Sequence, residues 1–168
     1  MNILRHFIFA CAVMALLVAG ASCASWGYHP VFTLSLHEFS DVDGSRLTIG
    51  VKDVAHVYTR RIMKYGFLTS RDITAAEVYG PEENGKYGLR LTINMWQAND
   101  VRTTANANRG VLFAVLLDGE YVDCAHFTRE TYEGDAFVVE PIFTKYVAEQ
   151  IADHVERNFE YFSRKHRW

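Results

Sequence analysis

The stretch VLFAVLL, Val111–Leu117, is followed by Asp118-Gly119 and by a second extended run that begins with Tyr121-Val122. An Asp-Gly pair between two strand-like runs is a strong hairpin signal, because both central residues of a type I′ turn need positive φ. A Gly134-Asp135 turn and a third apolar run, Phe137–Val139, come next. The sequence therefore predicts a β-hairpin that turns at Asp118-Gly119, and the other elements are placed around it.

A long amphipathic helix is predicted to begin at Thr144, directly after Phe143. The Thr144 hydroxyl can accept a hydrogen bond from an unpaired amide of the first helical turn. Apolar residues then recur at three- and four-residue spacing and form one stripe. The stripe consists of Val147, Ile151, Ala152, Val155, Phe159 and Phe162. We expect this stripe to pack on the sheet.

Two further hairpins are predicted on the N-terminal side. Val31–Leu36 alternates apolar with polar residues, and Leu47–Val51 resumes the pattern after a turn, which favours a first hairpin. The second hairpin turns around Asn84-Gly85, a pair typical of turns. The expected inner face of its second strand consists of Leu89, Leu91, Ile93 and Met95.

A second helix is predicted over 96–108, which is polar, rich in alanine and free of Gly and Pro. Trp96, Val101 and Ala105 are expected to face the sheet, and Gly110 to cap the helix, since Gly adopts the left-handed conformation without penalty. Hairpins thus predominate, with two helices to cover one face. The predicted fold class is α+β, with an antiparallel-rich sheet and two helices packed on one face.

Composition places the chain among ordinary globular proteins. Its 168 residues are 49% hydrophobic and 22% charged, which suffices for a single core. The net charge of −3 provides no concentrated basic face, so a nucleic-acid partner is not expected.

The N-terminus has the pattern of a signal peptide. Arg5 supplies the positive region, Phe7–Val18 the apolar core, and residues 19–25 are small enough for cleavage. About twelve apolar residues are too few for a membrane span, which needs roughly twenty. The predicted organisation is a signal peptide over 1–23, N-terminal strands and a linker over 24–66, and an α+β domain over 67–168. We expect export to the bacterial periplasm, or membrane anchoring that faces it.

Two kinds of processing fit this segment. An ordinary signal peptidase could cut after Ala21 or after Ala24, whereas Gly20–Cys23 resembles a lipobox in which Cys23 becomes the acylated first residue. Gly20 departs from the larger aliphatic residue that a lipobox usually has. Both forms stay open, and in the second a lipid anchor on Cys23 would hold the domain at a membrane.

The titratable residues do not predict a catalytic or metal site. Cys124 stands in an alternating strand and is best explained as a small buried hydrophobe, and His126 as a packing residue, because no acid is identifiable beside the pair. Glu149, Asp153 and His154 are interpreted as the solvated face of a helix, since His154 is turned about 100° from Asp153. No catalytic residue, metal or cofactor is therefore expected.

A calcium loop is also disfavoured. Asp41 and Asp43 precede Gly44 as in such loops, but Gly50 stands where the later acidic ligand is expected.

From about Phe67 to Asn158 the chain resembles the head subdomain of the first large periplasmic domain of SecD, the accessory subunit of the bacterial preprotein translocase. The order and spacing of a set of short motifs carry the resemblance. The matching residues are Leu68-Thr69, Asp72-Ile73, Ala76, Thr103–Asn106, Gly110, Ala114–Gly119, Gly134, Phe143-Thr144, Ala148 and Ala152. Among them, Gly110, Asp118, Gly119, Gly134, Phe143 and Thr144 mark the family's hairpin and the loops beside it.

Three departures from the family pattern follow the hairpin. Cys124–His126 stands where the family tends to place a Pro, Glu133-Gly134 replaces a Gly-Gly pair, and Glu140-Pro141 replaces a Gly. SecD also has transmembrane helices that couple proton flow to export. None is expected here after the signal, so the resemblance does not imply proton-driven pulling.

What the resemblance implies is a detached, non-enzymatic head domain that binds secreted or envelope proteins and assists export or envelope assembly. A sheet edge beside the loop at 128–135 is a reasonable peptide contact, since extended segments add to edges through main-chain hydrogen bonds. Two alternatives stay open: a small periplasmic enzyme, which needs ionisable groups gathered around His126 or His154, and a purely structural envelope lipoprotein.

Overall fold

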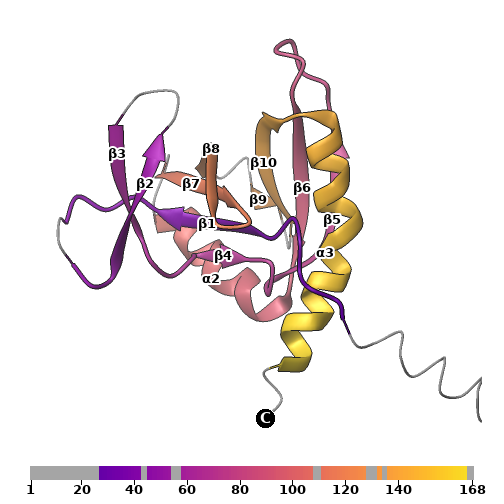
Figure 1. Ribbon diagram of the computed structural model, residues 1–168, viewed down its shortest axis with the longest axis horizontal. Helices are drawn as coiled ribbons and strands as arrows, with labels where there is room; N and C mark the ends of the chain where they lie inside the picture. Colours follow the sequence, from indigo (N-terminus) through magenta and orange to yellow (C-terminus); the bar gives the residue numbers. More distant parts are fainter. Residues whose placement is uncertain are drawn as a thin grey trace, which may run out of the picture.

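The computed structural model describes residues 27–42, 45–53, 58–107, 111–127, 132–133 and 136–165. Its strands form three antiparallel sheets (Figure 1). The first sheet has the order β4-β1-β7-β8 and consists of β1 (Leu34–Glu38), β4 (Leu68–Thr69), β7 (Val111–Leu117) and β8 (Glu120–Phe127). The second has the order β5-β6-β10-β9 and consists of β5 (Ile73–Tyr79), β6 (Tyr87–Ile93), β9 (Tyr132–Glu133) and β10 (Ala136–Phe143).

The third sheet is the hairpin of β2 (Thr48–Asp53) and β3 (Tyr58–Met63). Two helices complete the described fold, α2 (Met95–Ala107) and α3 (Lys145–Lys165). Neither helix combines the length and apolar character that a membrane-spanning helix needs, among the residues that the structure describes. The predicted α+β class with antiparallel pairing and two helices is confirmed, and the strands divide among three sheets.

The β7–β8 hairpin forms as the Asp-Gly signal predicts. Leu117 pairs with Glu120, and the two turn residues have positive φ, 50° at Asp118 and 85° at Gly119. Gly adopts such angles freely, and Asp is among the few other residues that do so at low cost. The second predicted hairpin is also confirmed, because β5 pairs with β6 across the turn that contains Gly85.

The predicted first hairpin is wrong. Leu34–Glu38 pairs with β7 on one side and β4 on the other, and Thr48–Asp53 pairs with β3. Alternation predicts that both segments are strands, but it does not specify which strands pair. β4 and β7 occupy the two hydrogen-bonding edges of β1, so β2 cannot pair with it.

β7 is buried on both of its faces, which explains its continuous apolar run. Phe113 and Val115 point into the main core, whereas Ala114 and Leu116 pack under the β2–β3 hairpin. The main core joins both four-stranded sheets with both helices. Its largest fully buried side chains include Phe113, Phe137, Phe143, Leu34, Leu36, Leu68, Ile73, Leu89, Leu91 and Ile151.

α3 packs against β5, β6 and β10 through its apolar stripe, as predicted (Figure 1). Ile151 and Val155 are buried, and Phe162 lies under the Arg71 guanidinium, 5.6 Å from the ring centre. The Thr144 hydroxyl accepts a hydrogen bond from the Val147 amide at 3.4 Å, so the predicted N-cap is confirmed.

α2 is confirmed as a helix, with Val101 buried in the main core. The predicted orientations of Met95 and Trp96 are wrong, because their side chains are 79% and 85% exposed. Asn94 explains the difference: its side-chain oxygen accepts from the Gln97 amide at 2.9 Å and so begins the helix before Met95. Strand alternation therefore stops at Ile93. Gly110 and the side chain of Ala105 lie outside the described part.

Candidate functional site

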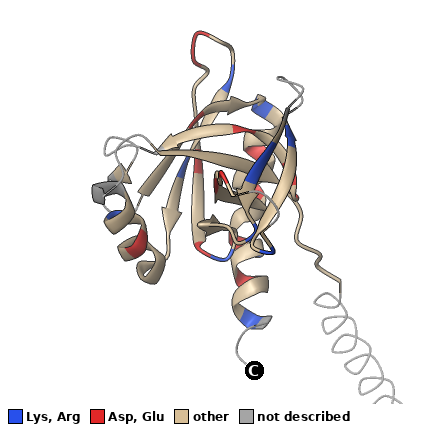
Figure 2. Cartoon of the chain, turned by 90° about the vertical axis from the view of Figure 1, so that its left-hand side faces the viewer, with Lys and Arg blue, Asp and Glu red and all other residues tan. Residues whose placement is uncertain are grey.

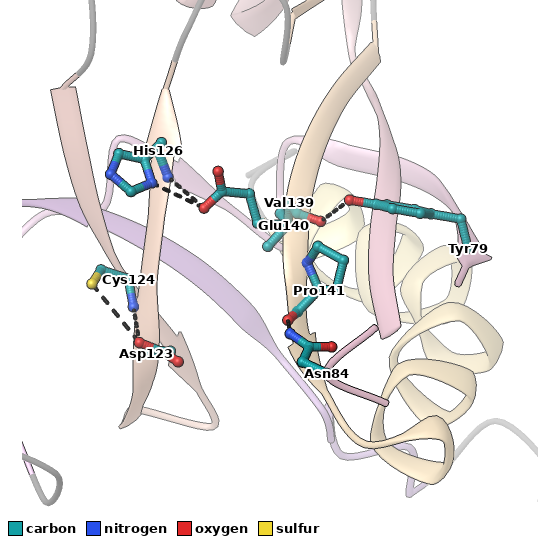
Figure 3. A network of polar contacts seen from close by, with 8 residues as sticks. All are labelled: Tyr79, Asn84, Asp123, Cys124, His126, Val139, Glu140 and Pro141. Carbon is teal, nitrogen blue, oxygen red and sulfur yellow. Dashed lines mark hydrogen bonds and ion pairs between the residues drawn. The ribbon is translucent and has the colours of Figure 1, made fainter. Parts of the chain in front are cut away.

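His126 on β8 and Glu140 on β10 point toward one another across the two large sheets (Figure 3). Glu140 Oε2 lies 3.0 Å from His126 Nδ1 and accepts from the His126 amide at 3.4 Å. The expectation that His126 lacks an acid is therefore wrong. Their side chains are 58% and 42% exposed, and surface ion pairs of this kind contribute only about 0–1 kcal/mol.

Cys124 lies two residues before His126 and is only partly buried. Burial raises the pKa of the Cys124 thiol, a hydrogen bond with Tyr121 lowers it, and the Asp123 carboxylate raises it again. Asp123 Oδ1 also accepts from the Cys124 amide at 2.9 Å. Because the thiolate is the reactive form, this environment favours an inert thiol at neutral pH.

The remaining contacts in Figure 3 hold the β5–β6 hairpin to β10. The Tyr79 hydroxyl donates to the Val139 carbonyl at 3.0 Å, and the Asn84 side chain donates to the Pro141 carbonyl at 3.3 Å. Burial raises the pKa of Tyr79, and the Glu82 carboxylate adds to the increase. This network links strands and has the character of a structural contact.

The residues marked by the family motif occupy turns and element boundaries. Asp118 and Gly119 form the β7–β8 turn, Phe143 is buried at the end of β10, and Thr144 caps α3. Gly110, Gly134 and Cys23 lie outside the described residues, as does most of the loop at 128–135. Tyr132 and Glu133 of that loop form β9, which pairs with the beginning of β10.

The segment at 28–33, which we call the strap, packs along the C-terminal half of α3 (Figure 1). Asn158 is fully buried, its oxygen accepts from the Tyr28 hydroxyl at 2.8 Å, and its amide donates to the Val31 carbonyl at 2.9 Å. At the other end of the strap, the Phe32 and His154 rings lie 5.5 Å apart. No local sequence signal marks Asn158, because its partners are more than a hundred residues away.

The two metal hypotheses find no assembled ligand set. Glu149 pairs with Lys145 at 3.8 Å, and His154 Nδ1 donates to the Gln150 carbonyl at 2.8 Å. Within the described ranges, no three His, Cys, Asp or Glu side chains gather as a metal site would require. Asp41 is exposed, and Asp43 and Gly44 lie outside those ranges. Figure 2 shows acidic and basic residues interspersed over most elements.

Hollows lined by described residues lie elsewhere on the surface, and two of them differ in their charge. The larger has a volume of about 760 Å³ and lies between the end of β1, the start of β3 and the start of β7. Its lining includes acidic and basic side chains together, Glu38, Asp41, Arg60 and Arg61, and Arg60 stacks over Phe39 at 5.3 Å.

The second hollow, of about 570 Å³, lies between the end of β6 and the first turns of α2. Its lining is mainly uncharged. The residues that line it are Ile93, Met95, Trp96, Ala98, Asn99 and Arg102, which together we call the Trp96 surface.

No protein-family model and no curated protein matches the sequence. Among solved structures, the chain is similar to SecDF, a membrane component that enhances protein export, with a TM-score of 0.51 and 15% identity over 76% of this chain and 63% of that one. It is also similar to SecDF in its super-membrane-facing form, with a TM-score of 0.50 and 15% identity. That match covers 74% of this chain and 18% of the other. The resemblance to SecD is thus confirmed at the level of the fold.

Proposed function

We propose that this chain is an exported, non-enzymatic domain that binds secreted or envelope proteins and assists their export or assembly. The observation that carries the proposal is the fold likeness to SecDF over 76% of the chain. That structure is of a membrane component that enhances protein export. The chain spans 63% of the length of that structure and 18% of the length of the super-membrane-facing SecDF structure.

The local chemistry supports binding better than catalysis. Burial raises the pKa of the Cys124 thiol and so disfavours its reactive thiolate form, and His126 contacts Glu140 with both side chains partly exposed. Catalytic groups usually lie in a cleft that excludes water and shifts their pKa values toward their task. The alternative of a small periplasmic enzyme needs further ionisable groups around His126 or His154, and the contacts of His154 are with Gln150 and Phe32.

Binding to a labelled, permanently unfolded secretory chain tests the proposal. Fluorescence anisotropy is expected to rise to saturation as the folded domain is added, and the native form of the same secretory protein should bind far more weakly. The circular dichroism spectrum of the domain confirms that it is folded. Lack of binding at high micromolar concentrations of a folded domain would refute the proposed function.

Export makes a separate prediction about the N-terminus. Mass spectrometry of the protein purified from an expressing bacterium should find a processed chain, either acylated at Cys23 or cut after Ala21 or Ala24. The acylated product would place the domain at a membrane. An unprocessed chain that begins at Met1 would contradict export.

A further inference from the structure

The start of α2 presents two large apolar side chains to solvent. Met95 and Trp96 are 79% and 85% exposed, although they stand in the first turn of a helix that is anchored in the core. Val101 lies five residues after Trp96, which is about 140° around the helix, so its burial turns Trp96 outward. The cap by Asn94 fixes this rotation. The exposure of Trp96 therefore follows from how the helix is held.

The hollow beside Trp96 is large enough to hold a side chain, and most of the residues that line it are apolar. Its volume of about 570 Å³ lies in the range of roughly 300–1,000 Å³ that is typical of ligand pockets. Ile93 and Ala98 are buried apolar residues of its lining, and Met95 and Trp96 are exposed apolar ones. Met adapts its shape to different partners, and Trp is enriched among residues that dominate binding energy.

The charge of the lining indicates which kind of ligand the hollow would bind. Arg102 is the charged side chain among the six residues that line the hollow, and it is exposed. Asp100, also on α2, is rotated about 160° from Arg102 and does not line the hollow. A guanidinium beside an apolar depression complements a ligand that carries a carboxylate next to a large apolar group.

We propose that the Trp96 surface binds segments of non-native secreted chains in which a large apolar side chain stands next to an acidic one. The inference rests on the proposed function and names the site and the kind of segment. The apolar side chain occupies the hollow against Met95 and Trp96, and the acidic side chain pairs with Arg102. Binding through adaptable side chains and one charge tolerates many sequences, as a carrier of unfolded chains requires.

The test uses two short fluorescent peptides that differ only in the residue next to a Phe, which is Asp in one and Lys in the other. The wild-type domain should prefer the Asp peptide. Trp96→Ala should weaken binding of both peptides by at least about tenfold, the scale of a binding hot spot. Arg102→Glu should reverse the preference, so that the Lys peptide binds better. That gain shows that the variant is folded.

Matched controls separate this site from general surface effects. Tyr146→Ala removes an aromatic side chain that is 64% exposed at the start of α3, and Arg46→Glu reverses a charge outside the hollow. Both should bind the Asp peptide as the wild type does. If Trp96→Ala and Arg102→Glu also bind like the wild type, the site is refuted, while the proposed function stands. If the wild type binds neither the peptides nor a long unfolded chain, both proposals fail.

A last measurement tests binding to vesicles of anionic phospholipid, because an exposed Trp beside an Arg is also found at membrane interfaces. The wild type and Trp96→Ala should bind vesicles equally. Loss of vesicle binding in Trp96→Ala, together with unchanged peptide binding, would assign the surface to lipid and overturn the inference.

Discussion

The Asp118 carboxylate accepts two hydrogen bonds from Thr33, from its amide at 2.8 Å and from its hydroxyl at 2.9 Å, and the Asp118 amide donates to the Thr33 carbonyl at 2.8 Å. The two residues are 85 positions apart in the sequence. The residue that turns the β7–β8 hairpin therefore also fixes the end of the strap where β1 begins.

Asp118→Ala should lower the free energy of unfolding by about 2 kcal/mol, because it removes charge-assisted hydrogen bonds and leaves a residue that disfavours the φ of 50°. Asp118→Asn should cost only about 1 kcal/mol, because Asn tolerates positive φ and keeps one acceptor oxygen. Urea unfolding measures both. Equal stability of the two variants would show that neither the side-chain acceptor nor the tolerance of positive φ at position 118 contributes measurably.

Asn158→Ala should destabilise the protein by about 1–3 kcal/mol and release the strap, because it leaves the Val31 carbonyl and the Tyr28 hydroxyl without their partner. Tyr28→Phe removes only one of these hydrogen bonds and should cost about 1 kcal/mol. Limited proteolysis should cut the strap faster in the Asn158 variant. Cleavage at the wild-type rate would mean that other contacts hold it.

Thr144→Val should lower the free energy of unfolding by about 1 kcal/mol, because a valine side chain cannot accept the hydrogen bond that the Val147 amide donates at the start of α3. Thr144→Ser keeps the hydroxyl and serves as the control. Thermal unfolding should rank the serine variant close to the wild type and the valine variant below it. The reverse ranking would exclude a capping role.

Cys124 should react slowly with iodoacetamide at neutral pH, and the pH of half-maximal rate should lie above that of a small free thiol. Burial raises the thiol pKa, so a higher pH is needed to form the reactive thiolate. Asp123→Asn should move the profile to lower pH by removing a nearby negative charge. The measurement uses a variant in which Cys11 and Cys23 are serine. A profile below that of the free thiol would indicate an activated cysteine instead.

Local signals predicted the elements that depend on near neighbours. Asp118-Gly119 fixes the β7–β8 hairpin through its backbone angles, and Thr144 begins α3 through a bond to a residue three positions later. The partners of β1 were not predictable in the same way. β4 and β7 come from distant parts of the sequence, and alternation records that a strand has an apolar face without naming the strand beside it.

The candidate site shows the same limit. The alternation of β6 continues by coincidence into Met95, which hides the start of the helix. The outward position of Trp96 becomes predictable only when Asn94 is identified as the N-cap of α2. The sequence signal for this N-cap is the spacing of Asn94 and Gln97, since a Gln three residues after an N-cap residue is typical of the start of a helix. Glu140 was not predictable as the partner of His126, because β8 and β10 belong to different sheets.

Hydrogen exchange of the full domain, with and without a saturating unfolded secretory chain, tests the central claim most directly. Binding at the Trp96 surface should slow amide exchange from the end of β6 through the first two turns of α2, Ile93–Arg102, while the β7–β8 turn exchanges as before. The native form of the same secretory protein should leave these amides unchanged. Exchange that is identical everywhere, with and without the unfolded chain, would contradict the claim that this domain binds non-native secreted proteins.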